Sequence, residues 1–302
     1  MINHKNNMDN LSIESLFDET KKIKDPELRE KTIEFIKNPI PTHCEIENSN
    51  VSLEESPASV KRHHKYPKGL LEHTMAVTKL SYNIATALED VYGLELDKDL
   101  IVSGALLHDI MKPQNYVLKE EIKEYKVRNT ENNENKESNE NKNNNYNNNC
   151  ESEKPGYTIE TKVIRRFDHI SDFHLEHLTL AVSELYKRDF PLKLIKVVSS
   201  HHGDYGSSRP DSIEAWIIHL ADNMDANLND IAIRIGNSRA RDLNIEDNKL
   251  YEKITPLKIY ELRSHIGKEN LIEYLKDLME LNPKNGNEDL NKNKDNNEKD
   301  KN

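Results

Sequence analysis

Ionisable side chains lie inside the apolar faces of several predicted helices, and this feature restricts the fold of the chain more than any other. His73 lies four residues before Val77, on the apolar stripe of a helix expected over 70–91. Asp222 follows Ile218 by four residues, inside another apolar run. An unpaired carboxylate among apolar neighbours is costly in free energy, so it needs a cation or strong hydrogen-bond donors. The fold is therefore expected to bring these groups together.

The same placement recurs on other segments. Five further residues begin or end an apolar stripe: His108, Asp109, His177, His201 and His202. Taken singly, a buried histidine is more often a hydrogen-bonded core residue, and an aspartate in a helix more often pairs with lysine or arginine. Five helices that each direct such a group inward form a different pattern, because imidazoles and carboxylates together are ligands for divalent metals. The pattern predicts a metal centre.

The period of the apolar residues is helical through most of the chain, and few runs alternate as a strand would. We expect helices over 25–37, 70–91, 99–111, 175–186, 192–200, 213–227 and 256–281, the last broken near Gly267. These helices predict an all-α domain over 56–281, preceded by a helical extension over 1–55.

Two polar tracts, 129–149 and 282–302, interrupt and follow this domain. Both are rich in Asn, Glu and Lys, and each has one large apolar side chain, Tyr146 or Leu290. Such segments bury too little apolar surface to offset chain entropy. We expect the first to be a disordered insertion within the domain and the second a disordered tail, which accounts for the low hydrophobic fraction of 35%.

The net charge restricts the class of partner. Lys and Arg number 43 against 54 Asp and Glu, which gives a formal charge of −11. Binding to nucleic acid draws most of its affinity from neutralised phosphates, so this charge disfavours nucleic acid as the main ligand. No apolar run reaches the roughly 18 residues that cross a bilayer. We expect a cytoplasmic protein that does not enter membranes. The sequence leaves open whether the protein forms a homo-oligomer.

Four motifs occur in a fixed order along the chain: HHKYPKGLLEHT (63–74), GALLHDIMK (104–112), SHHG (200–203) and HLADNMDA (219–226). Over residues 61–229 this order resembles the HD-domain metal-dependent phosphohydrolases, a superfamily of helical bundles. The resemblance departs from the common pattern at Met111, where glycine usually precedes the lysine.

The resemblance implies a set of metal ligands. His73, His108, Asp109 and Asp222 match the ligands of a first ion. Asp109 is also similar to the bridging carboxylate of two-metal members. His177 and His201 match the ligands of a second ion. The resemblance leaves open whether His202 is a further ligand. Two divalent ions are thus implied, with Fe(II) expected and Mn(II) as the alternative.

Other residues near these motifs are candidates for substrate contacts. Lys112 matches a lysine that could clamp a phosphate, although a surface lysine at a helix end is an equal alternative. His63, His64 and Lys68 precede the first ligand and could contact phosphate or protonate a leaving group. A plain turn before a helix explains each of them as well.

Two narrower groups share the motifs: archaeal phosphodiesterases of tetrahydromethanopterin biosynthesis, which open dihydroneopterin 2′,3′-cyclic phosphate, and 3′–5′ exoribonucleases of the YhaM type. The exoribonucleases also have an OB-fold, and residues 1–55 show no alternation typical of that barrel. We therefore expect an enzyme that hydrolyses a small cyclic phosphodiester to a monophosphate. An exoribonuclease and a non-catalytic, nucleotide-binding HD sensor remain as alternatives.

Overall fold

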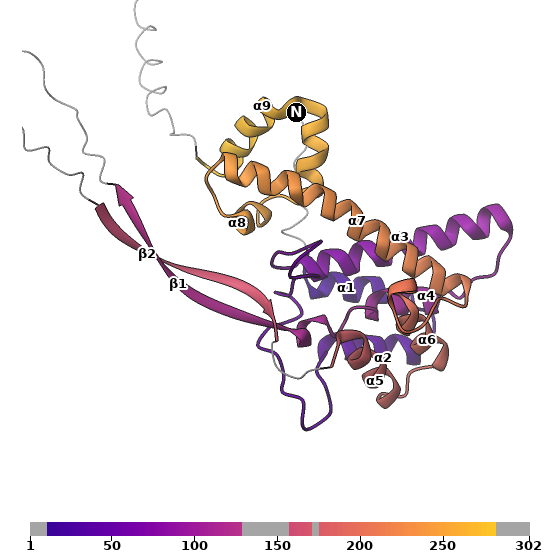
Figure 1. Ribbon diagram of the computed structural model, residues 1–302. Helices are drawn as coiled ribbons and strands as arrows, with labels where there is room; N and C mark the ends of the chain where they lie inside the picture. Colours follow the sequence, from indigo (N-terminus) through magenta and orange to yellow (C-terminus); the bar gives the residue numbers. More distant parts are fainter. Residues whose placement is uncertain (1–10, 129–156, 171–174, 282–302) are drawn as a thin grey trace, which may run out of the picture. The chain divides into compact units, whose positions relative to one another are not determined.

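A computed structural model describes residues 11–128, 157–170 and 175–281 of the chain (Figure 1). Helices dominate these residues, as the apolar period predicts. The helices are α1 (Ile13–Thr20), α2 (Pro26–Lys37), α3 (Gly69–Tyr92), α4 (Lys98–Leu107), α5 (His177–Lys187), α6 (Leu192–Ser200), α7 (Ile213–Asp242), α8 (Asp247–Tyr251) and α9 (Pro256–Leu278). Both Asn-rich tracts lie outside the described residues, so their expected disorder stays a prediction.

The central helices pack through one hydrophobic cluster. Helix α3 contacts α4 and α7, and α4 also contacts α6. Leu70, Val102, Leu106 and Ile218 are fully buried within this cluster. The packing brings one face of each central helix toward the others, and the predicted metal ligands lie on those faces.

Helices α1 and α2 belong to the predicted helical extension over 1–55, in which the sequence analysis placed a helix over 25–37 but none at α1. Asp25 caps α2, because its carboxylate accepts from the backbone N–H groups of Glu27 and Leu28. Leu16 of α1 and Phe35 of α2 are fully buried in the same cluster as the central helices. The proposed boundary between residues 55 and 56 stays a prediction.

Helix α4 ends at Leu107, four residues before the predicted end. The backbone N–H groups of Ile110 and Lys112 donate to carbonyls three residues back, and a short 3₁₀ turn, η2, covers Lys112–Asn115. Pro113 has no N–H to donate to the carbonyl of Asp109, so the α-helical hydrogen-bond pattern cannot continue through this segment. His108 and Asp109 therefore lie where the helix unwinds.

Helix α7 extends fifteen residues beyond its predicted end at Asn227, because a second apolar cluster covers its C-terminal half. Ile233 and Ala240 of α7 pack there with residues of α8 and α9, including Leu250 and Leu271. Helix α9 is interrupted at Gly267, whose φ of 79° is outside the helical range, as the sequence predicts.

A two-stranded hairpin was not expected. Strands β1 (Tyr116–Arg128) and β2 (Tyr157–His169) pair with each other, and residues 118–168 form a separate unit. Lys119 forms an ion pair with Asp168 at 2.9 Å across the strands. Ile122 is 73% exposed and Val163 is 60% exposed. With apolar side chains left in solvent, the strands lack the alternation that a half-buried sheet shows.

Among the described residues, none of the helices combines the length and the apolar character that a bilayer span requires.

Candidate metal centre

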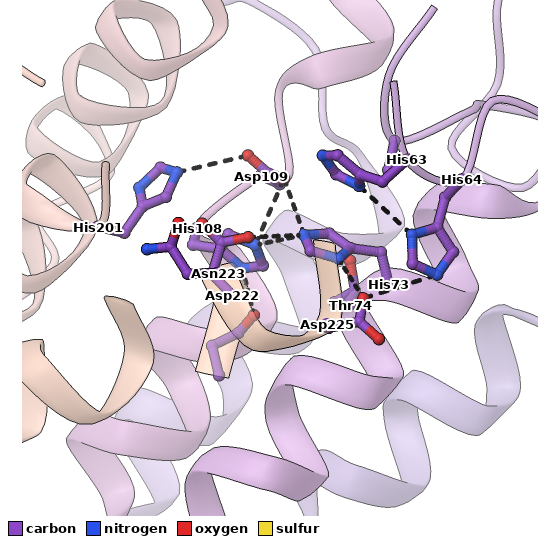
Figure 2. A network of polar contacts seen from close by, with 12 residues as sticks. His63, His64, His73, Thr74, His108, Asp109, His201, Asp222, Asn223 and Asp225 are labelled. Atoms are coloured by element: carbon purple, nitrogen blue, oxygen red, sulfur yellow. Dashed lines mark hydrogen bonds and ion pairs between the residues drawn. The ribbon is translucent and has the colours of Figure 1, made fainter. Parts of the chain in front are cut away.

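Five helices bring the predicted ligands to one place. His73 lies on α3, and His108 and Asp109 directly follow α4. His177 is the first residue of α5, and His201 caps the end of α6. Asp222 lies on α7. His73, His108, Asp109 and His201 lie close together in Figure 2. All four are almost completely buried, although they are polar.

A first cluster forms around Oδ2 of Asp109. The Nε2 atoms of His73 and His108 lie 3.4 and 3.3 Å from this oxygen. Nε2 of His73 also lies 3.2 Å from Oδ1 of Asp222 and from Nε2 of His108. These four residues thus direct imidazole nitrogens and carboxylate oxygens at a common point.

A second cluster forms around the other oxygen of the same carboxylate. Oδ1 of Asp109 lies 3.4 Å from Nε2 of His177 and 3.5 Å from Nε2 of His201. His202 joins this group, with ligand atoms all within 4.8 Å of one another. Each oxygen of Asp109 therefore faces a different set of histidines.

Polar atoms of the second cluster lack hydrogen-bond partners. Oδ1 of Asp109 and Nε2 of His177 are buried, and neither has a hydrogen-bond partner, although the two atoms lie 3.4 Å apart. Buried polar atoms are nearly always satisfied, so such atoms call for an explanation. A divalent cation between them would satisfy both, and the mixed imidazole and carboxylate donors fit that ion. The residues present therefore fit the metals that the sequence implies.

Three histidines of the clusters make hydrogen bonds through Nδ1, the ring nitrogen that faces away from the clusters. Nδ1 of His108 donates to the carbonyl of Ala105, and Nδ1 of His201 donates to that of Val198, both at 2.7 Å. A carbonyl only accepts, so in the neutral ring the proton is on Nδ1 and the Nε2 lone pair faces the cluster. Nδ1 of His73 contacts Oδ2 of Asp225 at 2.7 Å. This arrangement is common around metal-binding histidines.

Both carboxylates that face the first cluster are ionised. Burial alone would raise the pKa of Asp109, but the nearby charge of Lys112 holds that pKa well below its usual range. Burial also opposes ionisation of Asp222, whose pKa is lowered by its hydrogen bond and charge interaction with His73. The cluster thus concentrates negative charge in a buried place, which favours cations.

Asp225 is a site residue to which the sequence analysis assigned no role. It lies one turn after Asp222 on the same face of α7, and it is 4% exposed. The signal in the sequence that could have identified Asp225 was its place as a second aspartate on a buried helical face. The sequence could not show which atom it contacts, because its partner His73 is 152 residues away.

Lys112 lies directly against the cluster. Its Nζ is 2.5 Å from Oδ2 of Asp109, and its side chain is 11% exposed. It is therefore not the surface lysine that the sequence allowed as an alternative. The pKa of Lys112 is raised, because attraction to Asp109 outweighs the burial that would lower it.

The segment before His73 brings two more histidines close to the site. The ring centroids of His63 and His64 lie 5.0 and 5.4 Å from that of His73. Burial, followed by the charge of His73, lowers the pKa of His63 to about 2. His64 is fully buried, and its Nε2 lies 3.6 Å from Oδ2 of Asp225.

Backbone geometry fixes this segment. His64 and Lys68 have φ values of 45° and 66°, and a Cβ at position 69 would lie 2.1 Å from the carbonyl oxygen of His64, so glycine is required there. The Lys68 ammonium lies 3.3 Å from the carbonyl of Leu11 and 3.6 Å from Glu54. Within the described residues, these contacts do not join Lys68 to the clusters around Asp109.

Comparison with known proteins identifies a matching family model and several proteins of similar sequence. The family model "HD domain" matches residues 70–227. The chain is 45% identical over 267 residues to "Dihydroneopterin 2′,3′-cyclic phosphate phosphodiesterase" of Methanocaldococcus jannaschii, covering 88% of this chain and 90% of that relative. It is 28% identical over 184 residues to "3′-5′ exoribonuclease YhaM" of Bacillus subtilis, covering 57% of this chain and 43% of that relative. No solved structure matches the chain significantly.

The family match includes α4, α5 and α6 and contains all the residues of both clusters. His63, His64 and Lys68 precede it. Since the match extends over more than half of the chain, and the archaeal relative over nearly all of it, the chain belongs to the HD-domain family.

Proposed function

We propose that this protein hydrolyses 7,8-dihydroneopterin 2′,3′-cyclic phosphate to a monophosphate. The observation that carries the reaction type is Asp109, whose two oxygens face two separate clusters of histidines. The substrate is taken from the name of the archaeal relative, which aligns with 88% of the chain. Tetrahydromethanopterin biosynthesis and the cytoplasm, as the place of that reaction, belong to the same proposal.

Two divalent ions are part of the proposal, with Fe(II) preferred and Mn(II) as the alternative. His73, His108, Asp109 and Asp222 would hold the first ion, and Asp109, His177 and His201 the second. His202 is available as a further ligand, because burial lowers its pKa to about 3 and keeps the ring neutral. When bound, paired divalent ions neutralise phosphate charge and lower the pKa of bound water.

Lys112 is proposed to bind a non-bridging oxygen of the phosphate. Its ammonium is charged and buried, and it lies beside the carboxylate that both clusters share. A fixed positive charge at this place would orient the phosphodiester and stabilise the negative charge that develops at phosphorus. It would act beside the ions without being one of their ligands.

His63 and His64 take different roles in the proposal. His63 is partly exposed, and its low pKa keeps the imidazole neutral, so its ring N–H can donate to a phosphate oxygen. His64 is fully buried and near Asp225, so it would act by holding that residue and the segment before α3. Lys68 remains a candidate for a substrate contact at the edge of the site.

The test compares two substrates on one preparation. Protein purified without oxygen and loaded with Fe(II) or Mn(II) is incubated with the cyclic pterin and, separately, with single-stranded RNA. We expect rapid conversion of the pterin to a monoester and little shortening of the RNA. Stepwise RNA shortening with an unchanged pterin would favour the exoribonuclease. Binding of nucleotides without turnover of either substrate would favour the sensor.

A further inference from the structure

Asn229 of α7 is fully buried, and both ends of its side-chain amide are hydrogen-bonded to the segment before α3. Its Oδ1 accepts from the backbone N–H of His64 at 2.7 Å, and its Nδ2 donates to the hydroxyl of Tyr66 at 3.0 Å. A backbone N–H can only donate, so the amide oxygen is the atom that faces His64. Asn229 lies beyond the family match, which ends at residue 227.

The contact with Asn229 holds a backbone conformation that is costly in free energy. His64 has a φ of 45°, in the left-handed region that residues other than glycine rarely adopt. Its carbonyl accepts from the backbone N–H of Ala58 at 3.1 Å. Because its own N–H is bound by Asn229, the peptide groups on both sides of His64 are fixed. Strained backbone persists where the surrounding structure over-determines it, and such places are often functional.

A second arm of this network orients the asparagine itself. The hydroxyl of Tyr66 accepts from Asn229 and donates to Oε2 of Glu72 at 2.8 Å. The Tyr66 ring is fully buried, and its centroid lies 4.9 Å from that of Tyr251 on α8. Packing against α8 thus holds the hydroxyl that keeps the amide of Asn229 in its orientation.

We propose that Asn229 is a positioning residue for His63, acting through the peptide group that joins His63 to His64. That peptide group supplies the N–H that Asn229 binds, so its place relative to α7 determines where the His63 ring lies. The two rings are also in contact, since Nδ1 of His63 lies 3.3 Å from Nδ1 of His64. This role rests on the proposed function, in which His63 donates to a phosphate oxygen.

Helix α7 places the metal ligands and the His63 segment in one frame. Asp222, Asp225 and Asn229 follow one another at spacings of three and four residues, so they share one face of the helix. The first two contact His73, and Asn229 contacts the segment that carries His63. The centroid of the His63 ring lies 5.0 Å from that of His73. A displacement of about 1 Å in such a constellation can lower a rate about 100-fold.

The first experiment measures kcat for the cyclic pterin in Asn229→Ala, His63→Ala and the double variant, each loaded with Fe(II) or Mn(II). We expect Asn229→Ala to lower kcat by about 100-fold. In the His63→Ala background the same change should lower kcat by no more than about 2-fold, because the ring that Asn229 positions is then absent. Losses that multiply in the double variant would overturn the proposal, and so would a His63→Ala variant with unchanged kcat.

Metal affinity and a matched variant provide the controls. Asn227→Ala changes an exposed asparagine of the same helix, whose Nδ2 donates to the carbonyl of Asn223 at 2.7 Å, and should leave kcat unchanged. Circular dichroism checks that the variants are folded. Competition with a chelator should give the same metal affinity in Asn229→Ala as in the unmodified chain. A lower affinity would show that Asn229 acts on the ligands and would overturn the positioning of His63.

Tyr66→Phe separates the two arms and keeps the buried ring, so it serves if Asn229→Ala does not fold. The amide of Asn229 can still accept from His64, and we expect kcat to fall by about 10-fold or less. The His63→Ala background should abolish this effect too. An effect of Tyr66→Phe that persists there, or a loss equal to that in Asn229→Ala, would place the network's action at Glu72 and overturn the proposal.

Turnover by the unmodified chain is measured first, since its absence would overturn the proposed function and not the role of Asn229. Inorganic phosphate is then the probe, and its Kd for the metal-loaded protein replaces kcat in the same comparison. His63→Ala and Asn229→Ala should each raise this Kd, and the double variant should raise it no further than His63→Ala does. An unchanged Kd in Asn229→Ala, where His63→Ala raises it, would overturn the positioning role.

Discussion

At the scale of single residues, Asp109 is the side chain that both clusters of candidate ligands share. Its Oδ2 faces His73 and His108, and its Oδ1 faces His177 and His201. A carboxylate shared in this way couples the two clusters, while each histidine serves one of them. Substitutions at Asp109 and at the histidines should therefore differ in how many ions they remove.

Asp109→Ala should remove both ions and abolish turnover. It should also destabilise the fold by about 3–5 kcal/mol, because Lys112 would remain buried without its partner. His177→Ala is the matched comparison, since it removes a ligand of the second cluster alone and should leave one ion bound. Elemental analysis of metal content and denaturant unfolding measure the two effects. Normal metal content and full activity in Asp109→Ala would contradict the assignment.

Asp225 offers a finer test, because it acts through His73. In Asp225→Asn the amide oxygen can still accept from Nδ1 of His73, so the ring should keep its orientation while the nearby negative charge is lost. We expect metal affinity to fall about 10–100-fold, as for other partners of ligating histidines. Competition with a chelator measures this. Asp230→Asn, on the same helix, is the control and should leave affinity unchanged.

At the scale of elements, the sequence predicts the helices whose apolar faces form the core. Each expected helix occurs, since an apolar stripe that must be buried leaves a readable period. The predicted ligands also meet, because their helices face one another. The apolar pattern does not predict features that do not depend on burial of an apolar face. The β1–β2 hairpin leaves Ile122 and Val163 in solvent, and its pairing depends on cross-strand contacts. The contact of Asp225 with His73 likewise joins segments that no local pattern relates.

The Asn-rich insertion gives a prediction about the hairpin. It lies between the ends of β1 and β2, so deleting 129–149 leaves residues 150–156 to join the strands. The cost of closing a loop depends weakly on its length, and all the residues of both clusters lie outside this tract. We expect unchanged metal content and turnover in the deletion variant. Loss of metal after deletion would show that the tract supports the site.

At the scale of the whole molecule, the site makes the fold depend on its ions. Five helices, or the residues that directly follow them, each contribute at least one buried or half-buried polar group to the clusters around Asp109. Without cations, Oδ1 of Asp109 and Nε2 of His177 make no hydrogen bond, and such buried groups reduce stability. Unfolding separates the five helices and destroys both clusters. Metal binding to the folded chain should therefore stabilise every helix that supplies a ligand.

Chelation should therefore lower the melting temperature. An ion present at about 100 times its Kd stabilises the folded state by about 2.7 kcal/mol. At about 2–4 °C per kcal/mol for domains of roughly this size, the loss should be about 5–10 °C per ion. Calorimetry of loaded and chelated protein measures it. His177→Ala should show a smaller decrease on chelation, since it retains one ion, and Asp109→Ala should show almost none. A melting temperature that does not respond to chelation in protein shown to have bound metal would mean that the ligands do not tie the helices together.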